Sequence, residues 1–381
     1  MTSTIVIAGI GTHPFGRFAE SYIELGQYAA MAALRDAAMS WRDIDAAFCA
    51  SMYLPATAGL RVLGGLGRTG IPVVDIEAAC AGGAVALRQA IATIRAGSAR
   101  TVLVLGVEKM PRGFLDPRMI YQDWQIQSGI ALNPAYWAMR ARRHMHDHGT
   151  TERQIALVAQ KNHKNSVDSP ICMYRKPFSL SEILASKYVC EPIRLLEICS
   201  PCDGAAAVVV TLRDTTTPAA SRDVQIAAST HTTALYSADL RSPALSMSAR
   251  VNNPGPTSTA ADQSYQAAGL GPEDIDCLEV QDTDAFCELE AYEDLRLCAV
   301  GDGGAMIESG RTELGGAQPV NMSGGLISKG EPVGASHLGQ IAEIVSQLRG
   351  EAGSRQVAGA RTGLAHVLGA HGNSAVTILI R

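Results

Sequence analysis

The 381-residue chain lacks the features that mark several classes of protein. Its net charge is −5 and it contains no basic run, so a nucleic-acid-binding surface is not expected. It has no uninterrupted apolar stretch of transmembrane length. The run from Thr4 to Ala8 is typical of a core strand rather than a secretory leader. The sequence therefore predicts a soluble cytoplasmic protein.

Cysteine is present, but not in the pattern of a disulfide-bonded protein. The nine cysteines are odd in number and scattered over a long chain, which argues against a disulfide framework. The Cys-x-x-Cys sequence from Cys199 to Cys202 has no second pair and no histidine partner, so a zinc site is not expected there. We interpret it as a turn at a strand edge that leads into the buried run beginning at Gly204.

Two other groups resemble metal ligands only superficially. His144, His146 and His148 have suggestive spacing, but they lie in a basic segment without grouped carboxylates or thiolates, so we predict a solvated helix face. Asp282 and Asp284 are two carboxylates in one segment, which is poor support for a bound cation. The sequence therefore predicts no metal site.

Aromatic residues are scarce, at 5%, but hydrophobic residues make up 47% of the chain, enough for two core-bearing units or one duplicated domain. The segment 41–49 is repeated in kind at 272–280, and each copy follows a helix that ends in small residues. Strands alternate with helices, which predicts a layered α/β fold with mixed sheets. We expect two halves, 1–220 and 221–381, with strands 101–105 and 374–380 closing equivalent units.

The segment from about 111 to 188 interrupts this pattern. It is polar and relatively rich in aromatic and basic residues, and insertions of this length are usually functional. We predict a lid or cofactor-covering segment.

Cys80 is the residue with the most informative position. The apolar run from Val73 predicts a buried strand, and residues 84–96 predict an amphipathic helix closed by Gly97. A thiol at a helix N-terminus is favoured as the thiolate, and Gly82 and Gly83 let a substrate approach the backbone. This placement favours a nucleophile. The alternative is a small buried hydrophobic residue, the usual fate of a free cysteine.

Five stretches carry a resemblance to a known family over essentially the whole chain: 133–145, 149–150, 161–167, 200–207 and 323–335. On these residues the chain resembles the thiolase superfamily, most closely the sterol-carrier-protein-type thiolases and their bacterial thiolase-like relatives. The resemblance implies a duplicated five-layered αβαβα fold, a homodimer, and coenzyme A as a substrate rather than a permanently bound cofactor. It also implies that Cys80 carries an acyl group.

Three motifs depart from the family pattern. A Gly-His-Pro motif is expected where the chain has Gly330, Glu331 and Pro332, and a His-Asp-Cys-Phe motif is expected in the segment 279–284. Near the C-terminus, where thiolases place another cysteine, the chain has Leu368-Gly-Ala-His371-Gly372. The pairing of Gln-Asp-Thr with Gly-Glu-Pro resembles thiolase-like subunits, such as those of benzoylsuccinyl-CoA thiolase, that work with a small OB-fold/zinc-ribbon partner.

These departures leave several roles open. Glu331 is a candidate proton acceptor for Cys80, or only a helix cap. His371 is a candidate second acid/base, or only a turn residue. Gln281 can donate a hydrogen bond to a thioester carbonyl, or be a structural amide. The backbone N–H of Gly372 is a further oxyanion donor candidate.

Coenzyme A carries phosphates, so basic residues of the insertion are plausible contacts, although an exposed charged helix would look the same. The predicted contact residues are Arg140, Arg143, Lys164, Ser323 and Gly324. We expect an acyl-CoA C-acyltransferase working through acyl-Cys80, in either the cleavage or the condensation direction. The alternatives are a retro-aldolase acting on a coenzyme A thioester, and a non-catalytic subunit of an acyltransferase complex.

Overall fold

The computed structural model describes residues 3–113, 116–119, 121–129, 132–214, 222–234 and 255–381. A nine-stranded sheet runs through the molecule in the order β3-β2-β4-β7-β1-β8-β11-β10-β9. Its strands are β1 (Ser3–Gly16), β2 (Ala46–Ala50), β3 (Val73–Ile76), β4 (Thr101–Glu108), β7 (Asp203–Asp214), β8 (Val224–Thr232), β9 (Cys277–Glu279), β10 (Thr362–Gly369) and β11 (Asn373–Ile380).

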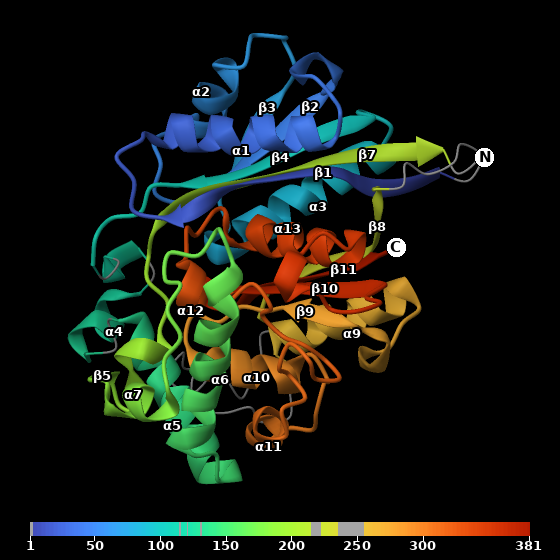
Figure 1. The fold of residues 1–381 in the computed structure, drawn as a ribbon. Coiled ribbons are helices and arrows are strands. Elements are labelled where there is room, and N and C mark those ends of the chain that lie inside the picture. Colours follow the sequence, from blue (N-terminus) through green and yellow to red (C-terminus); the bar gives the residue numbers. More distant parts are fainter. Residues whose placement is uncertain (1–2, 114–115, 120, 130–131, 215–221, 235–254) are drawn as a thin grey trace.

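The N-terminal half of the sheet contains β3, β2, β4, β7 and β1. β2 pairs in parallel with β3 and β4, whereas β7 pairs antiparallel with both β4 and β1. Helices α1 (Tyr22–Asp36) and α2 (Ala58–Gly64) cover one face and α3 (Gly82–Arg95) the other (Figure 1). α1 begins at a capping box, in which Ser21 and Glu24 satisfy each other's free backbone N–H groups.

The C-terminal half repeats this order. β9 runs parallel to β10, β10 pairs antiparallel with β11, and β11 with β8. A parallel bridge between Leu278 and Val320 places Val320 beside β9, as β3 lies beside β2. The predicted duplication is therefore confirmed. The strand equivalence is not. β4 corresponds to β10, because each pairs in parallel with the strand of its repeated segment, β2 or β9, and antiparallel with the next strand of the sheet; β11 therefore corresponds to β7.

Five layers result, which confirms the predicted αβαβα fold. They are α1 and α2, the N-terminal strands, α3 with α13 (Ser336–Arg349), the C-terminal strands, and α9 (Pro256–Ala268) with α10 (Ala285–Asp294) (Figure 1). α13 lies in the centre, where Gly83 of α3 packs against Leu338. A helix that is buried on all sides carries apolar side chains, or polar side chains with partners inside the protein, on every face.

One strand differs from its predicted environment. β3 was expected to be buried, but it lies at the sheet edge, and the Val74 side chain is 45% exposed. The apolar run that suggested burial has no partner on its outer side within the described residues.

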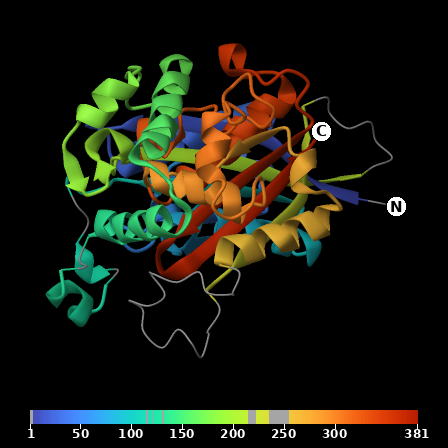
Figure 2. The same ribbon diagram turned by 90° about the horizontal axis from the view of Figure 1, so that it is seen from below.

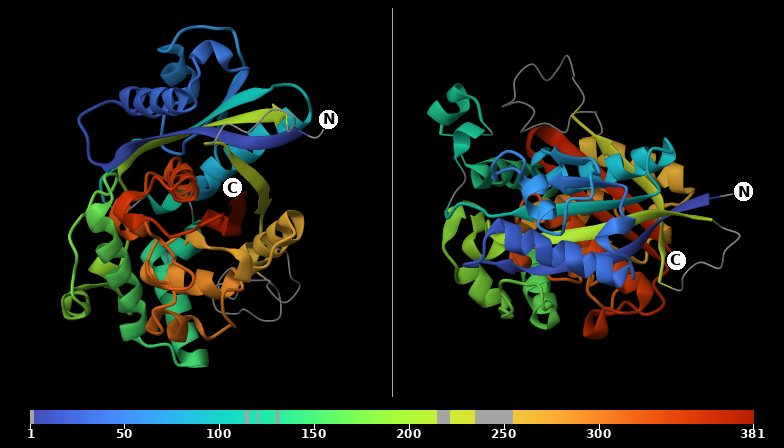
Figure 3. Two further views of the ribbon diagram at one scale, coloured as in Figure 1. Left: turned by 45° about the vertical axis from the view of Figure 1, so that its right-hand side comes forward. Right: turned by 90° about the horizontal axis from the view of Figure 1, so that it is seen from above.

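The segment 111–188 contains α4 (Asp123–Gln127), α5 (Asn133–His148), α6 (Glu152–Asn165) and α7 (Leu180–Ala185), followed by the β5 (Tyr188–Cys190) and β6 (Ile193–Arg194) hairpin. Figure 2 shows these helices at the end of the molecule opposite the two termini, and Figure 3 shows α4 standing away from the body. α6 instead packs against α10 and α11 (Gly303–Glu308), with Ile155 and Ala159 fully buried. Part of the segment therefore belongs to the core, and the lid role of the remainder stays a prediction.

The solvated histidine face predicted for α5 is wrong for His144. Its ring is buried, with Nδ1 2.8 Å from Oγ1 of Thr150 and Nε2 3.0 Å from Oε1 of Glu293. His366 lies in β10. The predicted boundary between the halves falls within 215–221, outside the described residues. In the part of the chain that the structure describes, no helix combines the length and apolar character needed to cross a bilayer.

Candidate active site

Cys80 lies in a tight turn between β3 and α3. The turn is a 3₁₀ segment, Ala79–Ala81, closed by a hydrogen bond of 3.0 Å from the N–H of Ala81 to the carbonyl of Ala78. Ala79 has φ 47°, a left-handed conformation that is strained for a residue with a Cβ. The predicted strand-to-helix placement is confirmed. Cys80 is half-buried, so it is not sealed in the core.

Two further residues follow the neighbouring strands. The carboxyl ends of the parallel strands β3, β2 and β4 meet at one edge, where α/β folds usually place their sites. Tyr53 follows β2, and Glu108 ends β4. The Glu108 carboxylate accepts hydrogen bonds from the backbone N–H groups of Met52 (2.9 Å), Tyr53 (3.0 Å) and Gly334 (3.1 Å). Its burial raises its pKa to about 7.

Glu331 reaches the same edge from the C-terminal half. It follows α12 (Gly325–Lys329) and Gly330, whose φ is 85° and where a Cβ would lie 2.5 Å from Sγ of Cys202. The backbone of Glu331 pairs with the Cys-x-x-Cys segment: its N–H donates to the carbonyl of Ser200 (2.8 Å), and its carbonyl accepts from the N–H of Cys202 (3.3 Å). That segment leads into β7, as predicted. It also forms one wall of the site, which was not predicted.

The buried Glu331 carboxylate accepts hydrogen bonds from two side chains. Nε2 of Gln281 donates to Oε1 at 2.8 Å, and the Cys199 thiol donates to Oε2 at 3.2 Å. The charge of the same carboxylate also acts on the nearby Cys80 thiol. Burial raises the pKa of both thiols well above the usual value, and the negative charge of Glu331 raises it further. The thiolate expected from the helix start is therefore not favoured at rest, because desolvation and the carboxylate outweigh the helix dipole.

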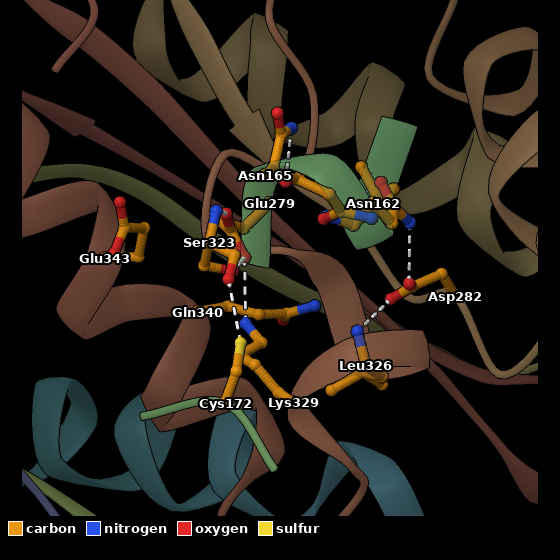
Figure 4. A network of polar contacts seen from close by, with 12 residues as sticks. Asn162, Asn165, Cys172, Glu279, Asp282, Ser323, Leu326, Lys329, Gln340 and Glu343 are labelled. Carbon is orange, nitrogen blue, oxygen red and sulfur yellow. Dashed lines mark hydrogen bonds and ion pairs between the residues drawn. The ribbon is translucent and has the colours of Figure 1, made fainter. Parts of the chain in front are cut away.

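A buried polar network surrounds α12, the helix that precedes Glu331 (Figure 4). Asp282 accepts from the N–H groups of Leu326 (2.6 Å) and Ile327 (3.1 Å) at the start of α12. At its end, Lys329 forms a 3.0 Å ion pair with Glu279, and both side chains are fully buried. Both ends of α12 are thus fixed to the end of β9 and the residues that follow it.

Two side chains at the site, those of Gln281 and Tyr53, each have a buried polar atom without a hydrogen-bond partner among the described residues. Both amide hydrogens of Gln281 are engaged, by Glu331 and by Oγ1 of Thr283 at 2.9 Å, so the amide is not free to bind a thioester oxygen. Its Oε1 is buried without a partner among the described residues. The buried hydroxyl of Tyr53 likewise has no hydrogen-bond partner within the described part of the chain. Burial, together with nearby carboxylates such as Glu108, raises the pKa of Tyr53 to about 12, so it stays a donor.

His371 lies in the turn between β10 and β11 with φ 61°, and its side chain is exposed. Its neighbours approach the Cys80 turn: Nδ2 of Asn373 donates to the carbonyl of Ala78 at 2.8 Å, and a Cβ at Gly369 would lie 3.1 Å from the nitrogen of Ala81. Catalytic roles for His371 and for the Gly372 N–H stay predictions.

The predicted coenzyme A contacts are dispersed. Arg140 pairs with the buried Glu290 at 2.6 Å, and the Ser323 side chain is buried against Glu279. Gly324 packs against Ser166. The exposed side chains of Arg143 and Lys164 pair with Asp147 (2.5 Å) and Glu313 (3.0 Å). Coenzyme A binding by these residues stays a prediction, and the placement favours Arg143 and Lys164 over the buried members.

Sequence reasoning missed Cys199, Tyr53 and Glu108. Cys199 lies 132 positions from Glu331, and no local spacing indicates that pairing. The only signal for Tyr53 and Glu108 is that each stands at the carboxyl end of a predicted strand. No group of three or more potential metal-ligating side chains gathers anywhere in the described residues.

Family models match most of the chain. Residues 5–174 match the family model described as thiolase, N-terminal domain, and residues 239–381 match thiolase C-terminal domain-like. Acetyl-CoA acetyltransferase of Methanothermobacter thermautotrophicus is 35% identical over 387 residues, covering 97% of each chain. Sterol carrier protein 2 of Rattus norvegicus is 34% identical over 393 residues, covering 98% of this chain and 71% of that protein.

Benzoylsuccinyl-CoA thiolase subunit BbsB of Thauera aromatica is 30% identical over 373 residues, covering 96% of this chain and 94% of that one. The solved structure of the Ltp2-ChsH2(DUF35) aldolase superposes with a TM-score of 0.84, covering 99% of this chain and 97% of that one. Its 24% identity makes it a likeness of fold.

Proposed function

The chain belongs to the thiolase family, and on that premise we propose that it is an acyl-CoA C-acyltransferase working through an acyl-Cys80 intermediate. The observation that carries the proposal is the nearness of the buried Glu331 carboxylate to the Cys80 thiol, which lies in a strained turn at a helix start. That arrangement pairs a nucleophile with a base, as covalent catalysis requires.

In the acylation step, Glu331 takes the Cys80 proton as sulfur attacks the thioester carbon. The carbonyl electron pair moves onto oxygen, and the tetrahedral intermediate then expels the coenzyme A sulfur, which takes the proton from Glu331. The developing oxyanion needs a donor. Because Gln281 has both amide hydrogens engaged, we assign that role to the unpartnered Tyr53 hydroxyl, with the Gly372 N–H as a second candidate.

Coenzyme A enters this scheme as a substrate. We place its phosphates near Arg143 and Lys164, with the more deeply paired Arg140, Ser323 and Gly324 as weaker candidates. The exposed His371 is a candidate acid/base only if substrate binding covers it.

We also propose a small OB-fold/zinc-ribbon partner subunit. The support comes from two similar proteins: BbsB is named as a subunit, and the Ltp2-ChsH2(DUF35) aldolase is named as a pair. A homodimer through the β3 edge would cover the exposed Val74, since unpaired apolar edges invite pairing. A cytoplasmic location remains part of the proposal.

The test is a covalent trap. The full chain, with any partner that co-purifies, is incubated with a panel of acyl-CoA and 3-oxoacyl-CoA thioesters, and then digested for mass spectrometry. We expect the acyl mass on the Cys80 peptide and its loss in Cys80→Ala. The absence of an adduct from every thioester, with or without partner, would contradict the proposal.

The same variant tests the alternative of a retro-aldolase, which needs a base but no acyl-enzyme. Carbon–carbon cleavage at the full rate by Cys80→Ala would favour that reading. Turnover of a purified complex that is indifferent to both Cys80→Ala and Glu331→Ala would instead favour a non-catalytic subunit.

A further inference from the structure

Cys199 is a second thiol beside the Glu331 carboxylate, the proposed base for Cys80. Its sulfur lies 3.2 Å from Oε2 of Glu331, and Gln281 occupies the other oxygen. A carboxylate offers about four lone-pair positions, so one Glu331 can serve two thiols and an amide.

Four backbone contacts fix Cys199 in this position. Its N–H donates to the carbonyl of Thr283 at 2.9 Å, and Ile198 bridges to Asp284. On the other side, Pro201 bridges to Glu331, whose N–H donates to the carbonyl of Ser200 at 2.8 Å. Cys199 is thus held between the segment that follows Gln281 and the segment that carries Glu331. Its side chain is half-buried, so it is not shut into the core.

The proposed function requires a base for the carbon–carbon step, and Cys80 cannot be that base because its sulfur is then acylated. We propose that Cys199 is the second acid/base, and that Glu331 carries a proton between Cys199 and Cys80. This inference rests on the proposed acyl-Cys80 function and names the residue that completes it.

The protons balance over a condensation cycle. After acylation, Cys199 passes its proton to Glu331 and becomes a thiolate. The thiolate then removes a proton from the α-carbon of a second acyl-CoA, and the C–H electron pair stays with that molecule as its enolate. The resulting enolate attacks the carbonyl carbon of acyl-Cys80, a carbon–carbon bond forms, and the bond from Cys80 sulfur to that carbon breaks. The released Cys80 thiolate takes the proton held by Glu331. Both thiols and the carboxylate return to their starting states, and cleavage runs the same steps in reverse.

The environment of Cys199 suits a base rather than a nucleophile. Burial and the charge of Glu331 raise the pKa of its thiol, so the thiolate, once formed, is a stronger proton acceptor than an ordinary cysteine. The exposed His371 has no comparable contact with Glu331 among the described residues.

The experiment separates the two half-reactions in Cys199→Ala. The first readout is the acyl mass on Cys80; the second is exchange of the α-hydrogens of acetyl-CoA with D₂O. We expect the variant to keep the Cys80 adduct within a few-fold of wild type. Exchange and overall turnover should fall by about 10²–10⁴-fold, the usual contribution of a positioned acid/base.

Cys202→Ala is the matched control. Its thiol belongs to the same segment, but it packs against Gly330 rather than the Glu331 carboxylate. An equal loss of exchange in Cys202→Ala would assign the effect to packing and overturn the inference. Exchange that persists in Cys199→Ala, or that is absent from wild type bearing the Cys80 adduct, would also overturn it. Loss of the adduct from wild type would instead contradict the proposed function itself.

Discussion

The Glu108 carboxylate accepts a 3.1 Å hydrogen bond from the backbone N–H of Gly334 and so joins the two duplicated halves at the site. Glu108 ends a strand of the N-terminal half, whereas Gly334 follows Glu331 in the C-terminal half. The same carboxylate holds the loop that carries Tyr53. The position of the nucleophile relative to its base therefore depends on a buried contact between residues 226 positions apart.

Glu108→Gln should disturb this contact between the two halves. A glutamine has one acceptor oxygen, so its NH₂ group would face a backbone N–H of Met52, Tyr53 or Gly334. A buried unsatisfied donor costs about 1–3 kcal/mol, so we expect that loss in the free energy of unfolding, measured by urea denaturation. The rate of Cys80 acylation should also fall. Unchanged stability and acylation would show that this contact is not needed.

Glu331→Gln should remove the base while keeping the shape of the site. The amide oxygen can still accept from Nε2 of Gln281, so the melting temperature should change little. We expect acylation of Cys80 to slow by about 10²–10⁴-fold, followed by stopped-flow release of coenzyme A. Glu308→Gln, which alters an exposed ion pair with Arg153, is the control. Acylation at the wild-type rate would rule out Glu331 as the proton acceptor.

Tyr53→Phe should remove only the unpartnered hydroxyl. If this group stabilises the oxyanion, kcat should fall by about 10²–10³-fold with little change in KM, because the interaction forms in the transition state. Tyr28→Phe, on the exposed face of α1, is the matched control and should behave as wild type. A change in KM alone would show that the hydroxyl only binds substrate.

Lys329→Met should leave the Glu279 charge buried without its cation. Breaking one partner of a buried pair costs about 3–5 kcal/mol, so the urea midpoint should fall markedly. The exposed pair gives the contrast: Lys164→Met should change the free energy of unfolding by less than about 1 kcal/mol. Similar effects of the two substitutions would refute the assigned burial of the Lys329 pair.

Stability should decrease as the pH rises from about 4.5 to about 8. Burial raises the pKa of Glu197 to about 8, well above that of an exposed glutamate. A carboxyl group whose pKa is higher in the folded state favours folding when protonated. Its contribution is therefore complete below pH 4.5 and is lost as the pH rises through about 8.

Within this window, Glu197 should lower the free energy of unfolding by up to about 1.4 kcal/mol per pH unit. Melting temperatures between pH 5 and 9 measure the effect. Glu197→Gln should flatten the profile, since an amide does not titrate. A slope that is the same in the variant would assign the dependence to other buried acids, such as Asp284, whose pKa burial raises to about 7.

The order of elements could be predicted because each element carries a local signal. Short stretches of sequence are enough to recognise each copy of the repeated segment, at 41–49 and 272–280. The same holds for the alternation of strands and helices and for the strand–Cys80–helix pattern. The predicted layers and the position of Cys80 followed from those signals. The environment of β3 did not, because an apolar edge strand and a buried strand have the same composition.

The sequence by itself determined the duplicated fold, the family and the candidate nucleophile. Only the tertiary structure decided which groups surround that nucleophile. Cys199 rather than His371 contacts Glu331, and both amide hydrogens of Gln281 are donated to other side chains of the protein. It also decided that His144 is buried and that the Cys80 thiol is not ionised at rest. These outcomes depend on contacts between distant segments and on desolvation. Neither of these produces a periodic pattern in the sequence.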